Sequence, residues 1–196
     1  DGRISPKFLH PGPGYGGSCF PKDTKALNFQ SDHAGVKLKT VKATIDVNRE
    51  QRTRLIDKAR RFFPTFRDVR VAIIGLTFKP GTDDLREAPA KQNIDILLNE
   101  GADIIAWDPL GAENFRKRYP NCAINFAKDI DEALTDADVC LIMTEWEKIV
   151  EYPLDNYKKY MRRPLVFDGR NCYKLSEVEK HEIFYDSIGR KIVDTL

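Results

Sequence analysis

Residues 69–76 read Val-Arg-Val-Ala-Ile-Ile-Gly-Leu, a β-rich run that is apolar except for one arginine and reaches a glycine at its end. A nearly continuous apolar run of this length is typical of a strand that is buried on both faces of a parallel sheet. A helical pattern follows over about 89–100, and Gly101 is suited to the left-handed position that ends many helices. These residues predict the first strand–helix unit of an α/β fold.

The pattern continues toward the C-terminus. Further strands are predicted at 103–107, 138–143 and 164–168, with helical stretches near 111–118, 129–135 and 154–161 between them. Strands that alternate with helices at this spacing form βαβ units. We therefore expect an α/β fold with a Rossmann-like, doubly wound parallel sheet.

The region before this sheet has a different texture. Residues 1–23 contain five glycines and four prolines and are predicted to be mostly loop. Residues 24–63 contain one glycine, Gly35, and apolar residues that recur in steps of three and four from 38 to 62, which predicts one long helix packed against another helix. Asn48 and Arg52 interrupt this seam and indicate register selection or a partner contact. We place the boundary between the two parts at residues 66 and 67, so the parts are 1–66 and 67–196.

Composition excludes several classes of protein. The chain has 196 residues, with 32 Lys and Arg against 30 Asp and Glu, and this balance predicts neither a nucleic-acid nor a membrane partner. A basic bias over 37–70 fits the solvated face of a helix better than a nucleic-acid stripe. No apolar run approaches the roughly 20 residues of a membrane span. The chain begins at Asp1 without a signal peptide or a Met, so we expect it to be part of a longer protein.

The four cysteines are Cys19, Cys122, Cys140 and Cys172, and they form no C-x-x-C pair. This spacing argues against a metal site and against a disulfide framework. It favours a reducing compartment, and we expect a cytoplasmic location. Cys140 lies in an apolar run and is most simply a small buried hydrophobe.

The first candidate site is the segment 8–23. Its glycines fit the expression G-x-G-x-x-G, but no strand precedes them and prolines interrupt them, so a dinucleotide fingerprint is not predicted. Glycines without a Cβ let a loop approach a ligand closely. The loop presents Cys19 near the start of a helix, with Lys22 beside it and Asp23 four residues on, a setting that favours a thiolate and a carboxylate able to handle a proton. From spacing alone, a catalytic nucleophile and an inert loop thiol both stay open.

The second candidate site is the segment 75–89, at the carboxyl end of the first strand, where open α/β sheets bind ligands. Lys79 and Arg86 can contact phosphate, and Asp83 or Asp84 can bind a sugar hydroxyl or hold Arg86. Pro89 suits the first turn of a helix, whose N-terminus favours an anion. A solvated polar loop is the alternative.

Together the segments resemble the UDP-glucose/GDP-mannose dehydrogenase family, and within it most closely the UDP-glucose dehydrogenases. The resemblance rests on Phe8-Leu9, Gly14–Asp23, Gly75–Arg86 and Phe167–Asn171. It extends over essentially the whole chain, but the chain corresponds only to the C-terminal part of such an enzyme. The family's N-terminal NAD-binding domain and its catalytic lysine and asparagine would precede Asp1.

The resemblance implies an NAD-dependent, four-electron oxidation of UDP-glucose to UDP-glucuronate, an activity of polysaccharide biosynthesis. Cys19 matches the nucleophile that forms a thiohemiacetal and then a thioester, and Asp23 matches the carboxylate that activates water or handles a proton. A thiol is needed because a free aldehyde is a poor hydride donor, whereas its thiohemiacetal presents an alkoxide that can expel hydride.

The resemblance also implies ligand contacts. Positions that match contacts to the UDP-sugar substrate are Phe8, Leu9, His10, Gly14, Tyr15, Gly16, Gly17, Phe78, Lys79 and Arg170. Arg86 matches an arginine that contacts the NAD cofactor. Arg3 matches one that reaches the substrate of a neighbouring subunit, and the helix over 24–63 matches the helix that builds a homodimer.

Two alternatives remain beside UDP-glucose oxidation. One is a dehydrogenase of another nucleotide sugar, such as UDP-N-acetylmannosamine or GDP-mannose. The other is a non-catalytic UDP-sugar-binding or dimerisation module, because half of the family's active site lies outside this chain. We therefore expect negligible turnover from these 196 residues alone.

Overall fold

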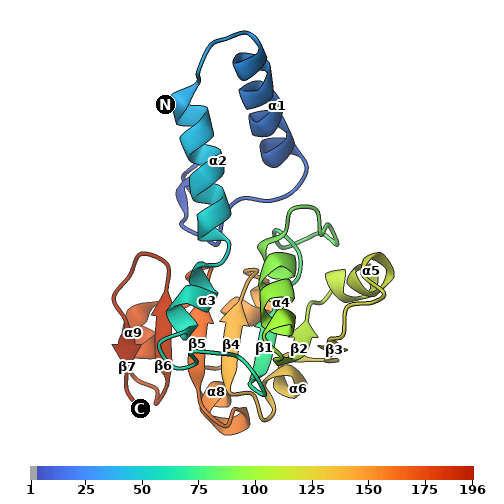
Figure 1. Ribbon diagram of the computed structural model, residues 1–196. Helices are drawn as coiled ribbons and strands as arrows, with labels where there is room; N and C mark the ends of the chain where they lie inside the picture. The colour runs from blue at the N-terminus through green and yellow to red at the C-terminus, as the bar shows by residue number, and fades with distance from the viewer. Residues whose placement is uncertain (1–3) are drawn as a thin grey trace.

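The computed structural model describes residues 4–196, leaving aside the side chains of Lys7 and Phe8, and is dominated by one seven-stranded sheet (Figure 1). Its strands are β1 (Arg70–Ile74), β2 (Asp103–Trp107), β3 (Asn125–Phe126), β4 (Val139–Ile142), β5 (Leu165–Asp168), β6 (Phe184–Ser187) and β7 (Val193–Asp194). Their order is β3-β2-β1-β4-β5-β6-β7, and all neighbours are parallel except β6 and β7. The expected Rossmann-like, doubly wound sheet is confirmed.

Helices cover both faces of the sheet. One face carries α3 (Arg54–Ala59), α4 (Pro89–Asn99) and α5 (Gly111–Arg118), and the other carries α6 (Ile130–Leu134), α7 (Glu147–Val150), α8 (Asp155–Tyr160) and α9 (Leu175–Val178). Because side chains alternate along a strand, Val71 and Ile73 of β1 pack on the first face and Ala72 and Ile74 on the second. A strand of continuous apolar residues can therefore be buried on both sides.

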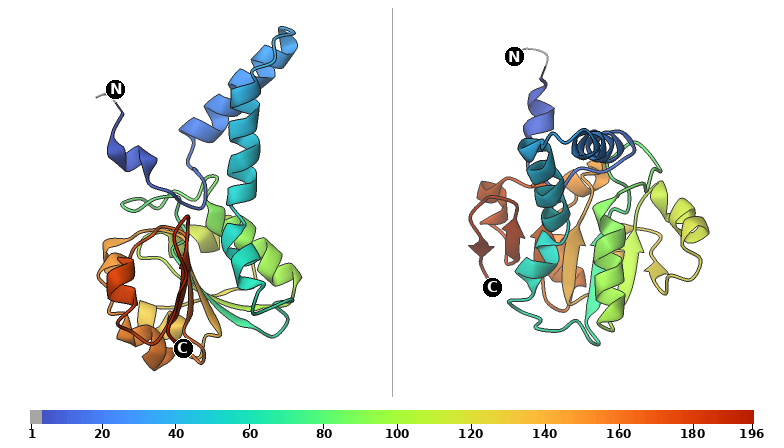
Figure 2. Two further views of the ribbon diagram at one scale, coloured as in Figure 1. Left: turned by 90° about the vertical axis from the view of Figure 1, so that its left-hand side faces the viewer. Right: turned by 45° about the horizontal axis from the view of Figure 1, so that its top comes forward.

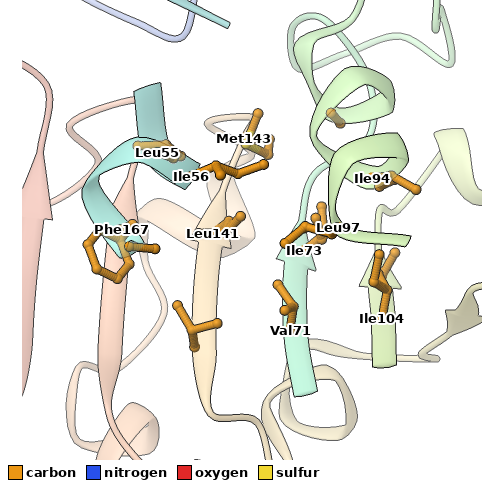
Figure 3. Packing of buried hydrophobic residues seen from close by; sticks show 14 of the residues in the cluster. Leu55, Ile56, Val71, Ile73, Ile94, Leu97, Ile104, Leu141, Met143 and Phe167 are labelled. Carbon is orange, nitrogen blue, oxygen red and sulfur yellow. The ribbon is translucent and has the colours of Figure 1, made fainter. Parts of the chain in front are cut away.

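The core on the first face is an apolar layer between α3, α4 and the sheet (Figure 3). Leu55 and Ile56 of α3, Ile94 and Leu97 of α4 and Phe167 of β5 are fully or almost fully buried. The predicted capping of α4 is also confirmed, because Pro89 occupies its first turn and Gly101 adopts φ +86° just beyond its end.

The predicted single helix over 24–63 is wrong. The chain forms α1 (Cys19–His33), turns at residues 34–38, and returns as α2 (Lys39–Gln51), so that two antiparallel helices lie side by side (Figures 1 and 2). The turn forms at Gly35, which has φ +72°, a conformation that other residues rarely adopt. The predicted seam from 38 to 62 corresponds to α2 followed by α3.

The hairpin of α1 and α2 projects beyond the carboxyl ends of the strands (Figures 1 and 2), and α3 joins it to the sheet. The Lys58 ammonium of α3 pairs at 2.6 Å with Asp186 of β6, which is almost fully buried. Before the hairpin, residues 6–9 form a single 3₁₀ turn, η1 (Pro6–Leu9). Within residues 4–196, no helix has both the length and the apolar character that a membrane span requires.

Candidate functional site

The glycine-rich loop of residues 10–18 is held by α2. Asn48 is mostly buried, and its side chain accepts a hydrogen bond from the Tyr15 N–H at 2.7 Å and donates one to the Tyr15 carbonyl at 3.2 Å. This side-chain amide pairs with Tyr15 as a neighbouring strand would. Gly14 lies so close, with φ +93°, that a Cβ there would stand 2.7 Å from the Asn48 oxygen.

Two further side chains of the α2 region complete the support. Gln51 donates to the Gly12 carbonyl at 2.9 Å, and Arg52 lies 3.4 Å from the Tyr15 carbonyl as a third donor. Asn48 and Arg52, the polar residues in the predicted apolar seam, therefore bind the glycine loop. The sequence alone had allowed register selection or a partner contact as their role. The loop is tied to one end of α2 by directional hydrogen bonds.

The other side of the loop packs against the segment after β1. The Gly17 N–H donates to the Arg86 carbonyl at 2.8 Å, and a Cβ on Gly17 would lie 3.0 Å from the Phe78 ring. A Cβ on Gly16 would lie 2.5 Å from the Glu87 carbonyl oxygen. Glycine is required at both positions because backbone approaches backbone and ring without room for a side chain.

Glu87 connects three elements by charge. Its carboxylate pairs with Lys25 of α1 at 2.9 Å and with Arg52, at the end of α2, at 2.8 Å. The hydrogen bond from Lys25 and that from Arg52 hold the pKa of Glu87 below its usual value, against partial burial. At neutral pH the carboxylate therefore ties the hairpin to the segment that follows β1.

These elements enclose a pocket of about 730 Å³. Its walls are the glycine loop, the outer face of α2, the residues after β1 and one arginine after β5. The lining residues are His10, Gly12, Gly14, Tyr15, Gly16, Phe20, Ala43, Thr44, Val47, Asn48, Gln51, Phe78, Lys79 and Arg170. A volume of this size accommodates a drug-sized or nucleotide-sized ligand.

Two cations contribute to this pocket. The Lys79 ammonium lies over the Phe78 ring, 5.4 Å from its centre. The Arg170 guanidinium is anchored by the Phe78 carbonyl at 2.8 Å and the Met143 carbonyl at 3.0 Å, and its Nε lies 3.1 Å from the Glu145 carboxylate. An anchored guanidinium and a lysine ammonium, both in contact with Phe78, can bind an anionic ligand.

Cys19 is the first residue of α1 and is exposed. Asp23 lies four residues later, on the same face of the helix, and pairs with Lys22 at 3.2 Å on the surface. Neither Cys19 nor Asp23 lines the pocket, although the adjacent Phe20 does. A helix start next to the thiol is confirmed, but the helix begins at Cys19 itself and not beyond it.

Arg86 is also exposed. Its guanidinium forms a two-pronged pair with Asp84, at 3.0 and 2.7 Å, and this hydrogen bond from Arg86 lowers the pKa of Asp84. Of the two roles open for the aspartates, holding Arg86 is confirmed for Asp84. Arg86 is thereby presented to solvent close to Cys19.

Side chains of the protein itself fill the space at the carboxyl ends of the strands, where a Rossmann domain would bind a dinucleotide. A Cβ on Gly75 would stand 2.5 Å from the Thr144 side chain, so this glycine permits packing of β1 against β4. At the end of β2, where Rossmann domains place a ribose-binding carboxylate, the buried Asp108 accepts from the Leu76 N–H at 2.7 Å and the Trp146 indole at 3.1 Å. The residues described at these strand ends do not fit NAD.

The structure brings seven of the residues expected at the site to the pocket wall, and they are His10, Gly14, Tyr15, Gly16, Phe78, Lys79 and Arg170. Gly17 lies behind them against Phe78, whereas Leu9 is 73% exposed and stays outside the wall. Arg3 and the side chain of Phe8 lie outside the part that the structure describes. The expectation that Cys140 is a buried hydrophobe is confirmed.

Sequence reasoning missed several residues of this site. Asn48 and Gln51 hold the loop, and Glu87 ties the hairpin to the segment after β1. Thr44 and Val47 line the pocket from α2. The polar interruptions of the apolar seam were the one signal for Asn48. Nothing in the local pattern marked Glu87, because its partners lie 35 and 62 positions away in the chain.

Comparison with known proteins agrees with this arrangement. Residues 72–175 match the model of the UDP-binding domain of the UDP-glucose/GDP-mannose dehydrogenase family, and residues 1–50 match the model of that family's central domain. The UDP-glucose 6-dehydrogenase YwqF of Bacillus subtilis is 41% identical over 98% of this chain and 44% of its own length. A UDP-glucose 6-dehydrogenase of Rhizobium meliloti is 42% identical over 97% of this chain and 43% of its own length.

The fold comparison gives the same result. A solved UDP-glucose dehydrogenase from the archaeon Pyrobaculum islandicum superposes with a TM-score of 0.80 and 28% identity, over 95% of this chain and 40% of that one. The chain thus spans less than half the length of the relatives that it matches. With two domain models and both curated relatives in agreement, the chain belongs to the UDP-glucose/GDP-mannose dehydrogenase family.

Proposed function

We propose that this chain is the C-terminal part of an NAD-dependent UDP-glucose 6-dehydrogenase, which oxidises UDP-glucose to UDP-glucuronate. The observation that carries the proposal is the pocket of about 730 Å³, which joins the loop before Cys19 to Lys79 and Arg170. The two curated relatives at 41% and 42% identity, both named UDP-glucose 6-dehydrogenases, favour UDP-glucose over UDP-N-acetylmannosamine or GDP-mannose.

In this proposal the pocket binds the nucleotide sugar. Lys79 and Arg170 neutralise its phosphates, and the glycine backbone from Gly14 to Gly17 lies against the sugar. The anchoring of Arg170 by two carbonyls lowers the entropy lost when it binds an anion. Phe78 contacts both cations and offers an apolar surface to the ligand.

Cys19 supplies the covalent chemistry. Its sulfur adds to the carbonyl carbon of the aldehyde formed in the first oxidation, a C–S bond forms, and the carbonyl oxygen becomes an alkoxide. Loss of hydride from this carbon converts the adduct to a thioester. Attack by water then breaks the C–S bond, releases the carboxylate and returns the thiol, with Asp23 taking the proton from the water.

NAD⁺ would accept the two hydrides when the whole protein binds it. Among the described residues the exposed Arg86 is a cation that can contact NAD, while Thr144 and Asp108 fill the space at the carboxyl ends of β1 and β2. The dinucleotide cradle must therefore come from residues outside this chain. For the same reason we propose that the isolated chain binds UDP-sugar without turning it over.

We also propose that the hairpin is the dimerisation element and that Arg3 contributes to the neighbouring subunit's site. Support comes from the exposed apolar side chains of the hairpin, among them Leu27, Phe29 and Val36. Isolated exposed apolar residues are ordinary, but several on one projecting hairpin are typical of an interface.

The test of the function replaces Cys19 by serine in the whole protein. Formation of UDP-glucuronate from UDP-glucose and NAD⁺ should fall by more than about a hundredfold, because the less nucleophilic hydroxyl cannot trap the aldehyde. Product is measured by chromatography, with UDP-N-acetylmannosamine and GDP-mannose as competing substrates. The control is Cys122→Ser, a half-buried thiol on another part of the surface, which should retain full yield. An unchanged yield in Cys19→Ser would refute the mechanism, and preference for another sugar would refute the substrate.

A further inference from the structure

The loop that carries Arg170 is held by the buried carboxylate of Asp168, the residue at its start. Asp168 is completely buried, and its oxygens accept hydrogen bonds from the Arg170 N–H at 2.7 Å, the Cys172 N–H at 2.7 Å and the Tyr185 hydroxyl at 2.6 Å. Burial raises the pKa of Asp168, whereas these three donors, with the Tyr185 hydroxyl first, lower it. A buried carboxylate is tolerated only when its oxygens are satisfied in this way.

The Tyr185 hydroxyl is itself held by Arg190, which lies in the turn between β6 and β7. Arg190 donates from one nitrogen to the Tyr185 hydroxyl at 2.8 Å and from another to the Tyr173 carbonyl at 2.8 Å. Arg190 therefore contacts both Tyr185 of β6, whose hydroxyl donates to Asp168, and Tyr173 at the far end of the loop that carries Arg170. A hydroxyl that accepts from a guanidinium is directed to donate its own proton to the carboxylate.

The middle of the same loop is bound to the same turn. Asn171 has φ +57°, and its amide exchanges two hydrogen bonds with the backbone of Ile188, at 3.0 and 3.1 Å. The loop of residues 168–173 is thus fixed at its start, middle and end by residues 185–190. These residues lie beyond the span 72–175 that matches the UDP-binding model.

We propose that Tyr185 and Arg190 are positioning residues that hold Arg170 in place for the anionic part of the nucleotide ligand. The proposal rests on the function proposed above for the pocket. The Arg170 backbone N–H donates to Asp168 while its guanidinium donates to the Phe78 and Met143 carbonyls, so the backbone contact sets the point from which the side chain extends. Loss of either support releases a long side chain that must be ordered again when the ligand binds.

The experiment is a double-mutant cycle on UDP affinity, measured by calorimetry in the whole protein. Tyr185→Phe should weaken UDP binding about three- to tenfold, and Arg190→Ala should do the same by the separate route through Tyr173. In the background of Arg170→Ala each change should cost less than about twofold, because the side chain that they position is gone. A role in stability alone would lower the unfolding temperature without this dependence on Arg170.

The matched control is Tyr152→Phe. Its hydroxyl also donates to an aspartate at 2.6 Å, Asp131, but contacts no residue of the Arg170 loop. UDP affinity should stay unchanged in this variant. The positioning role is overturned if Tyr185→Phe and Arg190→Ala bind UDP as tightly as the unmodified protein. It is also overturned if each change lowers UDP affinity by the same factor with and without the Arg170 side chain. In both cases the proposal that the pocket binds UDP-sugar is unaffected. If the unmodified protein does not bind UDP, or Arg170→Ala binds it equally well, both proposals fail.

Discussion

The hairpin and the sheet domain are stabilised in different ways. Every residue of β4 and β5 is buried, and apolar side chains fill both faces of the sheet. In α2 the single buried residue is Asn48, and in α1 the buried residues are Pro21 and Ser31. The sheet domain therefore depends on removal of apolar surface from water, whereas the hairpin and its loop depend on directional polar contacts.

This difference has a functional consequence. The pocket lies where the two parts meet, with a rigid wall after β1 and β5 and a wall on α2 that polar contacts hold. Burial is insensitive to small displacements, but a hydrogen bond weakens as soon as its geometry changes. We expect changes in the sheet domain to affect global stability, and changes in the hairpin to affect the loop before Cys19.

The largest effect is expected from the core. Phe167→Ala removes a completely buried ring that packs against Phe62 and Phe184, and should lower the free energy of unfolding by about 3–5 kcal/mol. Urea denaturation measures the change. The matched variant Leu110→Ala alters a side chain that is 53% exposed just before α5, and the free energy of unfolding should stay within about 0.5 kcal/mol. Equal losses at the two positions would contradict the comparison.

A smaller and more local effect is expected from the loop support. Asn48→Ala leaves the Tyr15 N–H and carbonyl without their main partner, so the free energy of local opening should fall by about 1–3 kcal/mol. Hydrogen exchange of the Tyr15 amide reports this opening. The control is Asn28→Ala, because the Asn28 side chain donates to Asp32 on its own helix; the Tyr15 amide should stay protected as before. Unchanged protection in Asn48→Ala would show that the loop does not need α2.

The smallest effect is expected from pH. Because Lys25 and Arg52 lower the pKa of folded Glu87, its contribution to stability is present above the unfolded value, near 4.5, and is lost as pH falls through the lower folded value. The stability difference between unmodified protein and Glu87→Gln should thus be constant above pH 4.5 and shrink below it. Unfolding measured at several pH values tests this, with Glu50→Gln on the exposed face of α2 as control. A difference that grows in acid would reverse the assigned sign.

The helices and strands that were predicted correctly are those that lie in a long apolar run or show a clear helical period in the sequence. The apolar runs of β1, β2, β4 and β5 and the period of α4 were long enough to place these elements within one or two residues. The short elements β3, β6, β7, α7 and α9 were not predicted, because two to four positions show no periodicity. The strands β4 and β5 are equally short, but each lies in a continuous apolar run that marked it. The single helix over 24–63 was wrong because the apolar period ran only from 38 to 62, so it carried no information on whether the residues before Gly35 belonged to the same helix.

The sequence by itself determined the fold class, the family resemblance and most of the pocket wall. Strand and helix periods are local, and the segments 8–23, 75–89 and 167–171 carry their residue types in order along the chain. Only the tertiary structure decided that Asn48 and Gln51 hold the glycine loop and that Glu87 ties the hairpin to the segment after β1. It also decided that Tyr185 and Arg190 support the loop that carries Arg170. Those contacts join residues brought together by the packing of the hairpin on the sheet and by the order of its strands. A hydrogen bond between such residues depends on distances in space that no spacing in the sequence encodes.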